Sequence, residues 1–301
     1  MKNIVRLISA PNAYLTAILA VTFWQSFAKK QIADVKKLSN LLLNKYQVIP
    51  NITYNEVNNY QVKLDVYQAK NSNLNPVVIF IHGGGWVWGN KETIQLDLLP
   101  YLEMGFSVVN VEYRLGSKYL APAAVEDCQL ALKWVKENAA KYNLDGDKII
   151  LTGHSAGGHL ALTTGGMCEG NEKIKVAAII NWFGITDVND LLSGENQRDY
   201  TVIWLGSQAN SEEIARKVSP INYISSNLPP ILTIHGDADA SVPYTHAVRL
   251  HQKLNEVGVV NELVTIPGGG HGNFTVEEKK QIYERIREFL RQKCAILPLD
   301  F

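Results

Sequence analysis

Cysteine is scarce in this chain, and the few cysteines form no recognisable set. Among 301 residues there are three, Cys128, Cys168 and Cys294, widely spaced and without a C-x-x-C pair. An odd and sparse set argues against a disulfide framework and against a zinc site, although it leaves room for one bridge.

The chain also lacks an excess of charge of either sign. Lysine plus arginine number 29, as do aspartate plus glutamate, so the formal net charge is zero. Nucleic-acid-binding proteins carry basic patches or stripes, and the sequence shows none. The P-loop, the dinucleotide pattern G-x-G-x-x-G and the zinc pattern H-E-x-x-H are missing too. We therefore expect no nucleic-acid partner, no cofactor and no metal.

Long hydrophobic runs are missing except near the N-terminus. After Lys2 and Arg6, the stretch Leu7–Ala28 carries no charge and ends in a small-x-small pattern. This arrangement predicts a signal peptide over residues 1–28 and hence an exported protein, periplasmic or secreted. Pro11 and Asn12 shorten the apolar stretch, which favours a signal peptide over a transmembrane span. A retained membrane anchor and a helix packed on a cytoplasmic domain are the alternatives.

Residues 29–301 read as a single α/β domain. A helical pattern (Gln31–Tyr46) and a hairpin (Asn51–Tyr67) precede short apolar runs that alternate with helical stretches. Such alternation predicts a mostly parallel sheet covered by helices on both faces. The expected strands of that sheet are Val77–Ile81, Ser107–Glu112, Lys148–Thr152, Val176–Trp182, Ile231–His235 and Glu262–Ile266.

One segment interrupts the alternation. Between Trp182 and Pro229 the sequence shows no strand, and this connection is far longer than usual. Sites of open α/β sheets form at the carboxyl ends of the strands. We therefore predict a small cap insertion at about residues 187–226 over a substrate pocket. A surface excursion with its own small core is the alternative.

The pattern G-x-S-x-G occurs between an expected strand and an expected helix. Gly153–Gly157 follows the run Lys148–Thr152 and leads into a helix-forming stretch. This context is typical of a nucleophile elbow, in which a tight turn exposes the Ser155 hydroxyl at the N-terminus of the helix. A plain glycine turn is the alternative. A serine nucleophile needs a base, a group that orients the base, and an oxyanion site.

A second glycine run follows the first strand of the expected parallel sheet. His82–Trp86 reads H-G-G-G-W, so its backbone can turn tightly and point amides into a cavity. We expect the oxyanion donors to be the amides of Gly84, Gly85 and Ala156. A phosphate-binding loop is the alternative, but no nucleotide motif accompanies it.

The base and the acid are sought after later strands. His271 lies in a glycine-rich segment after the last strand, which makes it the candidate base. Asp237 and Asp239 follow the strand before it, and Asp187 follows an earlier one. The order Ser155, Asp239, His271 is that of nucleophile, acid and base in α/β-hydrolases. Asp237 has a simpler interpretation as a turn residue.

The remaining histidines and the aromatic residues carry weaker signals. His82 is expected to anchor its loop, and neither His154 nor His159 has zinc-ligand spacing. His246 and His251 are interpreted as surface residues of a helix. Among the aromatic residues near strand ends, Trp86 and Trp182 are the candidates for lining a substrate pocket, with core packing as the alternative.

With these motifs in place, residues 54–290 resemble the α/β-hydrolase superfamily. The likeness is strongest to hormone-sensitive-lipase-like and feruloyl-esterase-like (BD-FAE-type) carboxylesterases. It rests on His82–Trp86, Tyr113–Leu115, Pro122–Asp127, Gly153–Gly158, His235–Asp239 and His271–Gly272. The family's acid stands four positions after the histidine of H-G-x-x-D, and this spacing selects Asp239 over Asp237.

The resemblance implies a serine carboxylesterase with the triad Ser155, Asp239 and His271. It would hydrolyse short-chain or aryl esters, of acetyl or feruloyl type, on small molecules or on polysaccharide. An amide hydrolase on the same triad is the alternative, and a binding protein on a retired hydrolase scaffold is a third hypothesis. A membrane partner is expected only if residues 1–28 are retained.

Overall fold

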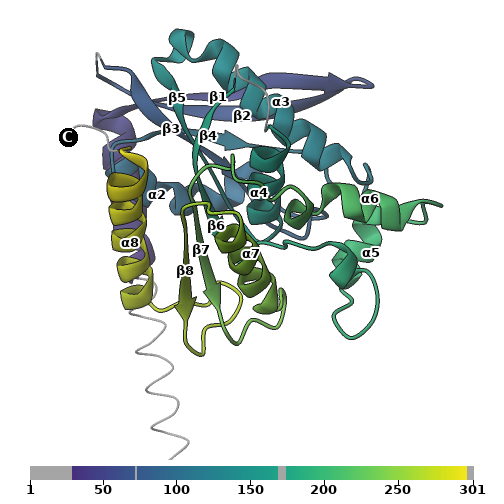
Figure 1. Ribbon diagram of the computed structural model, residues 1–301. Coiled ribbons are helices and arrows are strands. Elements are labelled where there is room, and N and C mark those ends of the chain that lie inside the picture. The colour runs from purple at the N-terminus through teal and green to yellow at the C-terminus, as the bar shows by residue number, and fades with distance from the viewer. Residues whose placement is uncertain (1–28, 72, 169–173, 297–301) are drawn as a thin grey trace, which may run out of the picture.

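The computed structural model describes residues 29–71, 73–168 and 174–296, which build one eight-stranded sheet (Figure 1). The strand order is β1-β2-β4-β3-β5-β6-β7-β8, and all pairs from β4 to β8 in that order are parallel. β2 pairs antiparallel with both β1 and β4. The strands are β1 (Tyr46–Val57), β2 (Tyr60–Ala69), β3 (Asn75–Ile81), β4 (Ser107–Val111), β5 (Leu144–His154), β6 (Val176–Trp182), β7 (Ile231–Gly236) and β8 (Asn261–Ile266). The predicted fold class is confirmed.

Helices cover both faces of the sheet, because successive side chains of a strand point to opposite sides. In β3, Val77, Ile79 and Ile81 join one buried cluster, while Val78 and Phe80 join the other. The first cluster is completed by α3 (Ala123–Asn138), α4 (Ala156–Met167) and α7 (Thr245–Glu256). The second is completed by α2 (Gln95–Glu103) and α8 (Val276–Cys294). Figure 1 shows α2 and α8 on the side opposite to α3 and α4.

The N-terminal helix covers residues 29–44 and ends earlier than predicted. Tyr46, expected as its last residue, instead begins β1, and its ring is buried. The Tyr46 hydroxyl donates to the carbonyl oxygens of Leu102 and Phe106. A long-range contact therefore overrides the local helical pattern at this position. Leu38 of this helix is buried in the cluster of α2 and α8, and the partly buried Leu41 and Leu42 pack against the same cluster.

The segment between β6 and β7 is helical, and two of its helices lie together at one side of the molecule in Figure 1. They are α5 (Asp199–Leu205) and α6 (Ser211–Val218), flanked by short 3-10 turns. Trp204 and Leu205 of α5 are fully buried in the cluster of α3, α4 and α7. The insertion thus shares the main core of the domain, and the alternative of a separate small core is wrong.

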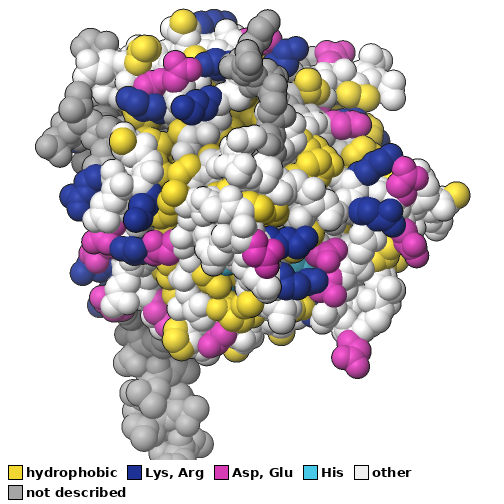
Figure 2. All heavy atoms as spheres, viewed as in Figure 1, with side chains coloured by type: hydrophobic (Ala, Val, Ile, Leu, Met, Phe, Trp, Pro, Cys, Tyr) yellow, Lys and Arg dark blue, Asp and Glu magenta, His cyan; other side chains and the backbone are white. Residues whose placement is uncertain are grey.

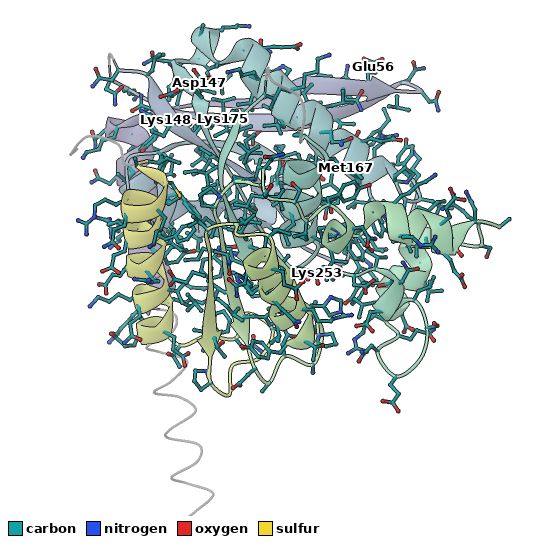
Figure 3. All side chains as sticks on the ribbon, viewed as in Figure 1. Glu56, Asp147, Lys148, Met167, Lys175 and Lys253 are labelled. Carbon is teal, nitrogen blue, oxygen red and sulfur yellow. The ribbon has the colours of Figure 1, made fainter. Side chains whose placement is uncertain are left out.

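The two ends of the sheet differ in character. Asp147, Lys148 and Lys175 lie together at the upper edge of Figure 3, where β5 and β6 begin. Figure 2 shows charged side chains of both signs scattered over the same view without a single-sign patch. The sequence motifs follow the opposite, carboxyl ends of β3, β5, β7 and β8, so the topology gathers them at one edge.

The predicted signal peptide, residues 1–28, lies outside the described residues. Within the described ranges, no helix combines the length and the apolar composition needed to cross a bilayer.

Candidate active site

The turn from β5 into α4 holds Ser155 in a strained backbone. Its φ is 57° and its ψ is −117°, at the position immediately before α4. Gly153 and Gly157 make this turn possible, because a Cβ on either would lie 2.4 Å or 2.1 Å from the Ile81 carbonyl oxygen. The elbow is thus pressed against the end of β3. The helix dipole of α4 points its positive end at the serine.

The structure brings Ser155, His271 and Asp239 into one hydrogen-bonded chain. The His271 Nε2 atom lies 2.9 Å from the Ser155 Oγ atom. Its Nδ1 atom lies 2.7 Å from the Asp239 Oδ2 atom. These residues come from three different strand ends, 116 and 32 positions apart in sequence. The geometry is that of a nucleophile, a base and an orienting acid.

The Asp239 carboxylate is buried and fully engaged. Its Oδ1 atom accepts hydrogen bonds from the amides of Ser241 and Val242, at 2.8 Å and 2.9 Å. Burial raises the pKa of this carboxyl, but hydrogen bonds from His235, His271 and Val242 outweigh it and hold the pKa well below its usual range. Asp237, the competing candidate, is exposed and accepts a hydrogen bond from the Gly268 amide, as a turn residue does.

A second histidine contacts the acid, and sequence reasoning assigned it no role. The buried His235 Nε2 atom lies 3.0 Å from the Val242 carbonyl oxygen and 3.3 Å from Asp239 Oδ2. Because a carbonyl oxygen only accepts, this nitrogen carries the proton and also faces the carboxylate. Asp239 Oδ2 is therefore approached by one histidine from each side. The H-G-x-x-D motif contained this residue, but it was used only for spacing.

The glycine run after β3 presents free amides beside the serine. Gly84 and Gly85 have φ values of 112° and 58°, which favour glycine. Neither amide donates a hydrogen bond to any other described residue. The Ala156 amide is at the first position of α4, where no intrahelical acceptor exists. Gly84 and Gly85 line the same cavity as Ser155, and Ala156 is the next residue in the chain, so all three remain candidate donors.

His82 anchors this loop from below, as the sequence predicted. Its ring is buried and stacks on the ring of Tyr113, with centroids 4.2 Å apart. Its Nδ1 atom lies 2.8 Å from the Gly83 carbonyl oxygen and donates to it. The histidine thereby fixes the backbone that carries the Gly84 and Gly85 amides.

Trp86 does not line a pocket, so that prediction is wrong. Its side chain is fully buried and stacks on Trp204 of α5, with ring centroids 4.1 Å apart. Its indole Nε1 donates to His159 Nδ1 at 3.0 Å, and His159 Nε2 donates to the Val218 carbonyl oxygen at 2.7 Å. The tryptophan therefore connects the glycine loop, α4 and the insertion. The packing partner Trp204 lies in a segment whose placement the sequence did not reveal.

The insertion also holds the loop that carries the acid. Arg198 donates from Nε to the Ser241 carbonyl oxygen and from Nη2 to that of Ala240. The Tyr200 hydroxyl donates to the Ser241 carbonyl oxygen at 3.0 Å. Within the described insertion, Tyr200 is the residue that lines the cavity beside Ser155. The insertion therefore holds the loop that carries Asp239 and contributes little to covering the cavity, so it differs from the predicted cap; its contacts through Arg198 and Tyr200 are called the clamp below.

Two further histidines were misplaced by the sequence interpretation. His246 and His251 of α7 are buried, with exposed fractions of 0% and 6%. His246 Nδ1 accepts from the Thr186 amide at 3.1 Å, and its Nε2 lies 3.1 Å from Asp190 Oδ2. Burial lowers the pKa of His246 to about 4. His246 thus joins the loop after β6 to α7, whereas the His251 Nδ1 atom lies 2.7 Å from Asn261 Oδ1 at the start of β8.

A cavity of about 1040 Å³ is lined by Ser155. Trp182, the second tryptophan candidate, lines it and donates from Nε1 to the Tyr101 hydroxyl. Phe183 also lines it, and its ring touches the His271 ring edge-on with centroids 4.7 Å apart. A site of this form can position a carbonyl group between the serine and the free amides.

Comparison with known proteins assigns this chain to a family. The sequence model of the BD-FAE family matches residues 64–254. The chain belongs to the BD-FAE family. Esterase LipC of Mycobacterium tuberculosis is 30% identical to it over 227 residues, which cover 69% of this chain and 56% of LipC. This chain spans about half the length of the curated relatives it matches.

Solved structures agree with the family. An esterase from Pyrobaculum calidifontis superposes with a TM-score of 0.71 at 28% identity, covering 90% of this BD-FAE chain and 92% of the other. A truncated carbohydrate esterase from gut microbiota gives a TM-score of 0.70 at 28% identity, covering 81% and 96%. The α/β-hydrolase fold is thus shown both by the sheet order and by these neighbours.

Proposed function

We propose that this BD-FAE protein is a serine carboxylic ester hydrolase. The observation that carries the proposal is the hydrogen-bonded chain from Ser155 through His271 to Asp239, placed beside the free amides of Gly84 and Gly85. The esterases among its relatives and structural neighbours support it. The substrates we propose are short-chain or aryl esters, including esters on saccharides, in line with the carbohydrate esterase neighbour.

The reaction follows from the geometry. Ser155 Oγ attacks the ester carbonyl carbon while His271 Nε2 takes the hydroxyl proton. The negative charge that develops on the carbonyl oxygen accepts hydrogen bonds from the amides of Gly84, Gly85 and Ala156. His271 then returns the proton to the alcohol oxygen as the bond to carbon breaks, leaving an acyl group on Ser155.

Water completes the cycle by the same route. His271 takes a proton from water as its oxygen attacks the acyl carbon, and the proton returns to Ser155 Oγ when the acid leaves. The Asp239 carboxylate holds His271 in the tautomer with its proton on Nδ1 and stabilises the imidazolium in both halves.

The test compares the wild type with Ser155→Ala on p-nitrophenyl acetate, butyrate and octanoate and on methyl ferulate. We expect turnover by the wild type, and a loss of about 10⁴-fold or more in Ser155→Ala with unchanged unfolding. Equal turnover by both proteins would refute the assignment of the nucleophile. Turnover of amides in place of all four esters would favour the amide-hydrolase alternative.

A further inference from the structure

The cavity at Ser155 is bounded by three helices, and the part between them is called the trench below. One face of each helix lines it, at spacings of three, four and seven residues that place side chains along one stripe. The lining residues are Leu96, Asp97, Leu99, Pro100 and Glu103 of α2, Val276, Lys279, Lys280 and Tyr283 of α8, and Lys30, Gln31, Asp34 and Lys37 of the N-terminal helix. On each helix the lining residues span seven positions, which corresponds to a rise of about 10 Å along the helix axis.

The inner part of the trench is apolar and the outer wall is charged. Trp182, Phe183, Leu99, Phe274 and Tyr283 lie toward the sheet, and all but the last are at most 8% exposed. The N-terminal helix supplies polar and charged side chains to the opposite wall. A group with an apolar body would therefore leave water by entering this trench, which favours its binding.

The N-terminal helix closes the trench without being packed there. Every residue from 29 to 37 is at least partly exposed, whereas Leu38 is buried beside α2. An ion pair between Lys37 and Glu103 joins this helix to the last turn of α2. The pair lies at the position farthest along α2 from its N-terminus, so it closes the far end of the trench.

We propose that residues 29–37 form a specificity-determining wall that selects esters with an elongated apolar group of about 10 Å. An eight-carbon chain or an aryl-alkyl group fills this length, whereas an acetyl group leaves most of the 1040 Å³ empty. The proposal rests on the carboxylesterase function above and narrows its substrate class. It also moves the main determinant of specificity from the predicted insertion to the N-terminal helix, α2 and α8.

The first experiment measures kcat/KM of the full chain for two ester series. One varies the acyl group from acetate to dodecanoate as p-nitrophenyl esters, and the other varies the alcohol as alkyl acetates. We expect one series to rise by about fourfold per methylene and to peak near eight carbons, since each buried methylene contributes about that factor. A flat profile in both series overturns the trench but leaves the esterase, whereas no turnover at any length overturns both.

The variants separate the trench from general effects. Leu99→Trp narrows it and should lower the ratio of eight-carbon to two-carbon turnover by about 16-fold, equivalent to two methylenes at about fourfold each. Lys37→Glu places two acids together at the far end, which should open it and raise twelve-carbon turnover relative to eight-carbon turnover. The swap Lys37→Glu with Glu103→Lys should restore the wild-type profile.

Lys36→Glu is the matched control. It makes the same charge change one residue away, at an exposed side chain that is not among those lining the cavity. We expect it to keep the wild-type length profile. If Lys36→Glu and Lys37→Glu shift the profile equally, or if the double swap does not restore it, the wall assigned to residues 29–37 is wrong.

Discussion

At the scale of single residues, the site depends on what surrounds the acid. Asp239 Oδ2 lies between His271 and His235, and its Oδ1 is held by two amides. Each hydrogen bond favours the ionised carboxylate and fixes its direction. The His271 ring therefore receives a charged and immobile partner, which a serine nucleophile needs on the far side of its base.

The two neighbouring aspartates make a direct comparison. Asp239→Asn removes the charge behind His271 and favours the wrong tautomer, so we expect kcat to fall by about 10⁴-fold. Asp237 is an exposed turn residue whose carboxylate accepts a hydrogen bond from the Gly268 amide. Because surface substitutions have small effects, we expect Asp237→Asn to change kcat by less than about threefold. Steady-state kinetics on p-nitrophenyl butyrate checks both. The opposite ranking would transfer the acid role to Asp237.

At the scale of elements, buried histidines tie α4 and α7 to the insertion. His159 of α4 is fully buried, and burial lowers its pKa to about 3. His246 of α7 has a pKa lowered to about 4 for the same reason. Both rings are held neutral, since each has one nitrogen that accepts from a neighbouring N–H. Protonating either one would break the contacts that fix the insertion.

These pKa values predict a loss of stability in weak acid. Below about pH 6.5 the unfolded chain binds protons that His159 and His246 in the folded protein do not bind. The contribution of these two neutral histidines to stability is therefore fully present above about pH 6.5. Below that pH, the free energy of unfolding should fall by about 1.4 kcal/mol per pH unit for each histidine, down to about pH 4. Urea unfolding at pH 7, 6 and 5 measures it. His159→Gln should show a shallower slope, and a stability constant from pH 7 to pH 5 would contradict the prediction.

The elements show which parts of the site the sequence could predict. Ser155 and His271 stand in glycine-rich turns after strands, so local pattern alone located them. Asp239 required the spacing of a family motif, because Asp237 has a similar local context. Trp86 was misjudged because its burial depends on Trp204, 118 positions later, and local pattern carries no information on that contact. The trench depends on where Leu38 anchors its helix, which is equally non-local.

At the scale of the whole molecule, the sequence predicted the fold more completely than it predicted the residues that line the pocket. The alternation of β-branched runs and helical stretches determined a parallel sheet, and family membership and sheet order confirm it. The specificity wall that we propose instead involves three helices that are distant in sequence, and their relative placement is a product of the packed core. Short sequence motifs therefore locate the candidate catalytic residues, whereas the proposed specificity wall depends on contacts between segments that are far apart in sequence.

The contacts of Arg198 and Tyr200 with the carbonyl oxygens of residues 240 and 241 affect the order in which activity and structure are lost during unfolding. These hydrogen bonds are partly exposed, whereas the sheet is buried. We therefore expect the contacts of Arg198 and Tyr200 to open at a lower free energy than the sheet. When the clamp opens, the Asp239 loop is released while the strands stay paired. Esterase activity should therefore disappear at a lower urea concentration than far-ultraviolet circular dichroism, and coincident transitions would show that the clamp and the sheet unfold together. Loss of activity would then precede loss of the core, and inactivation would be reversible as long as the core stays folded.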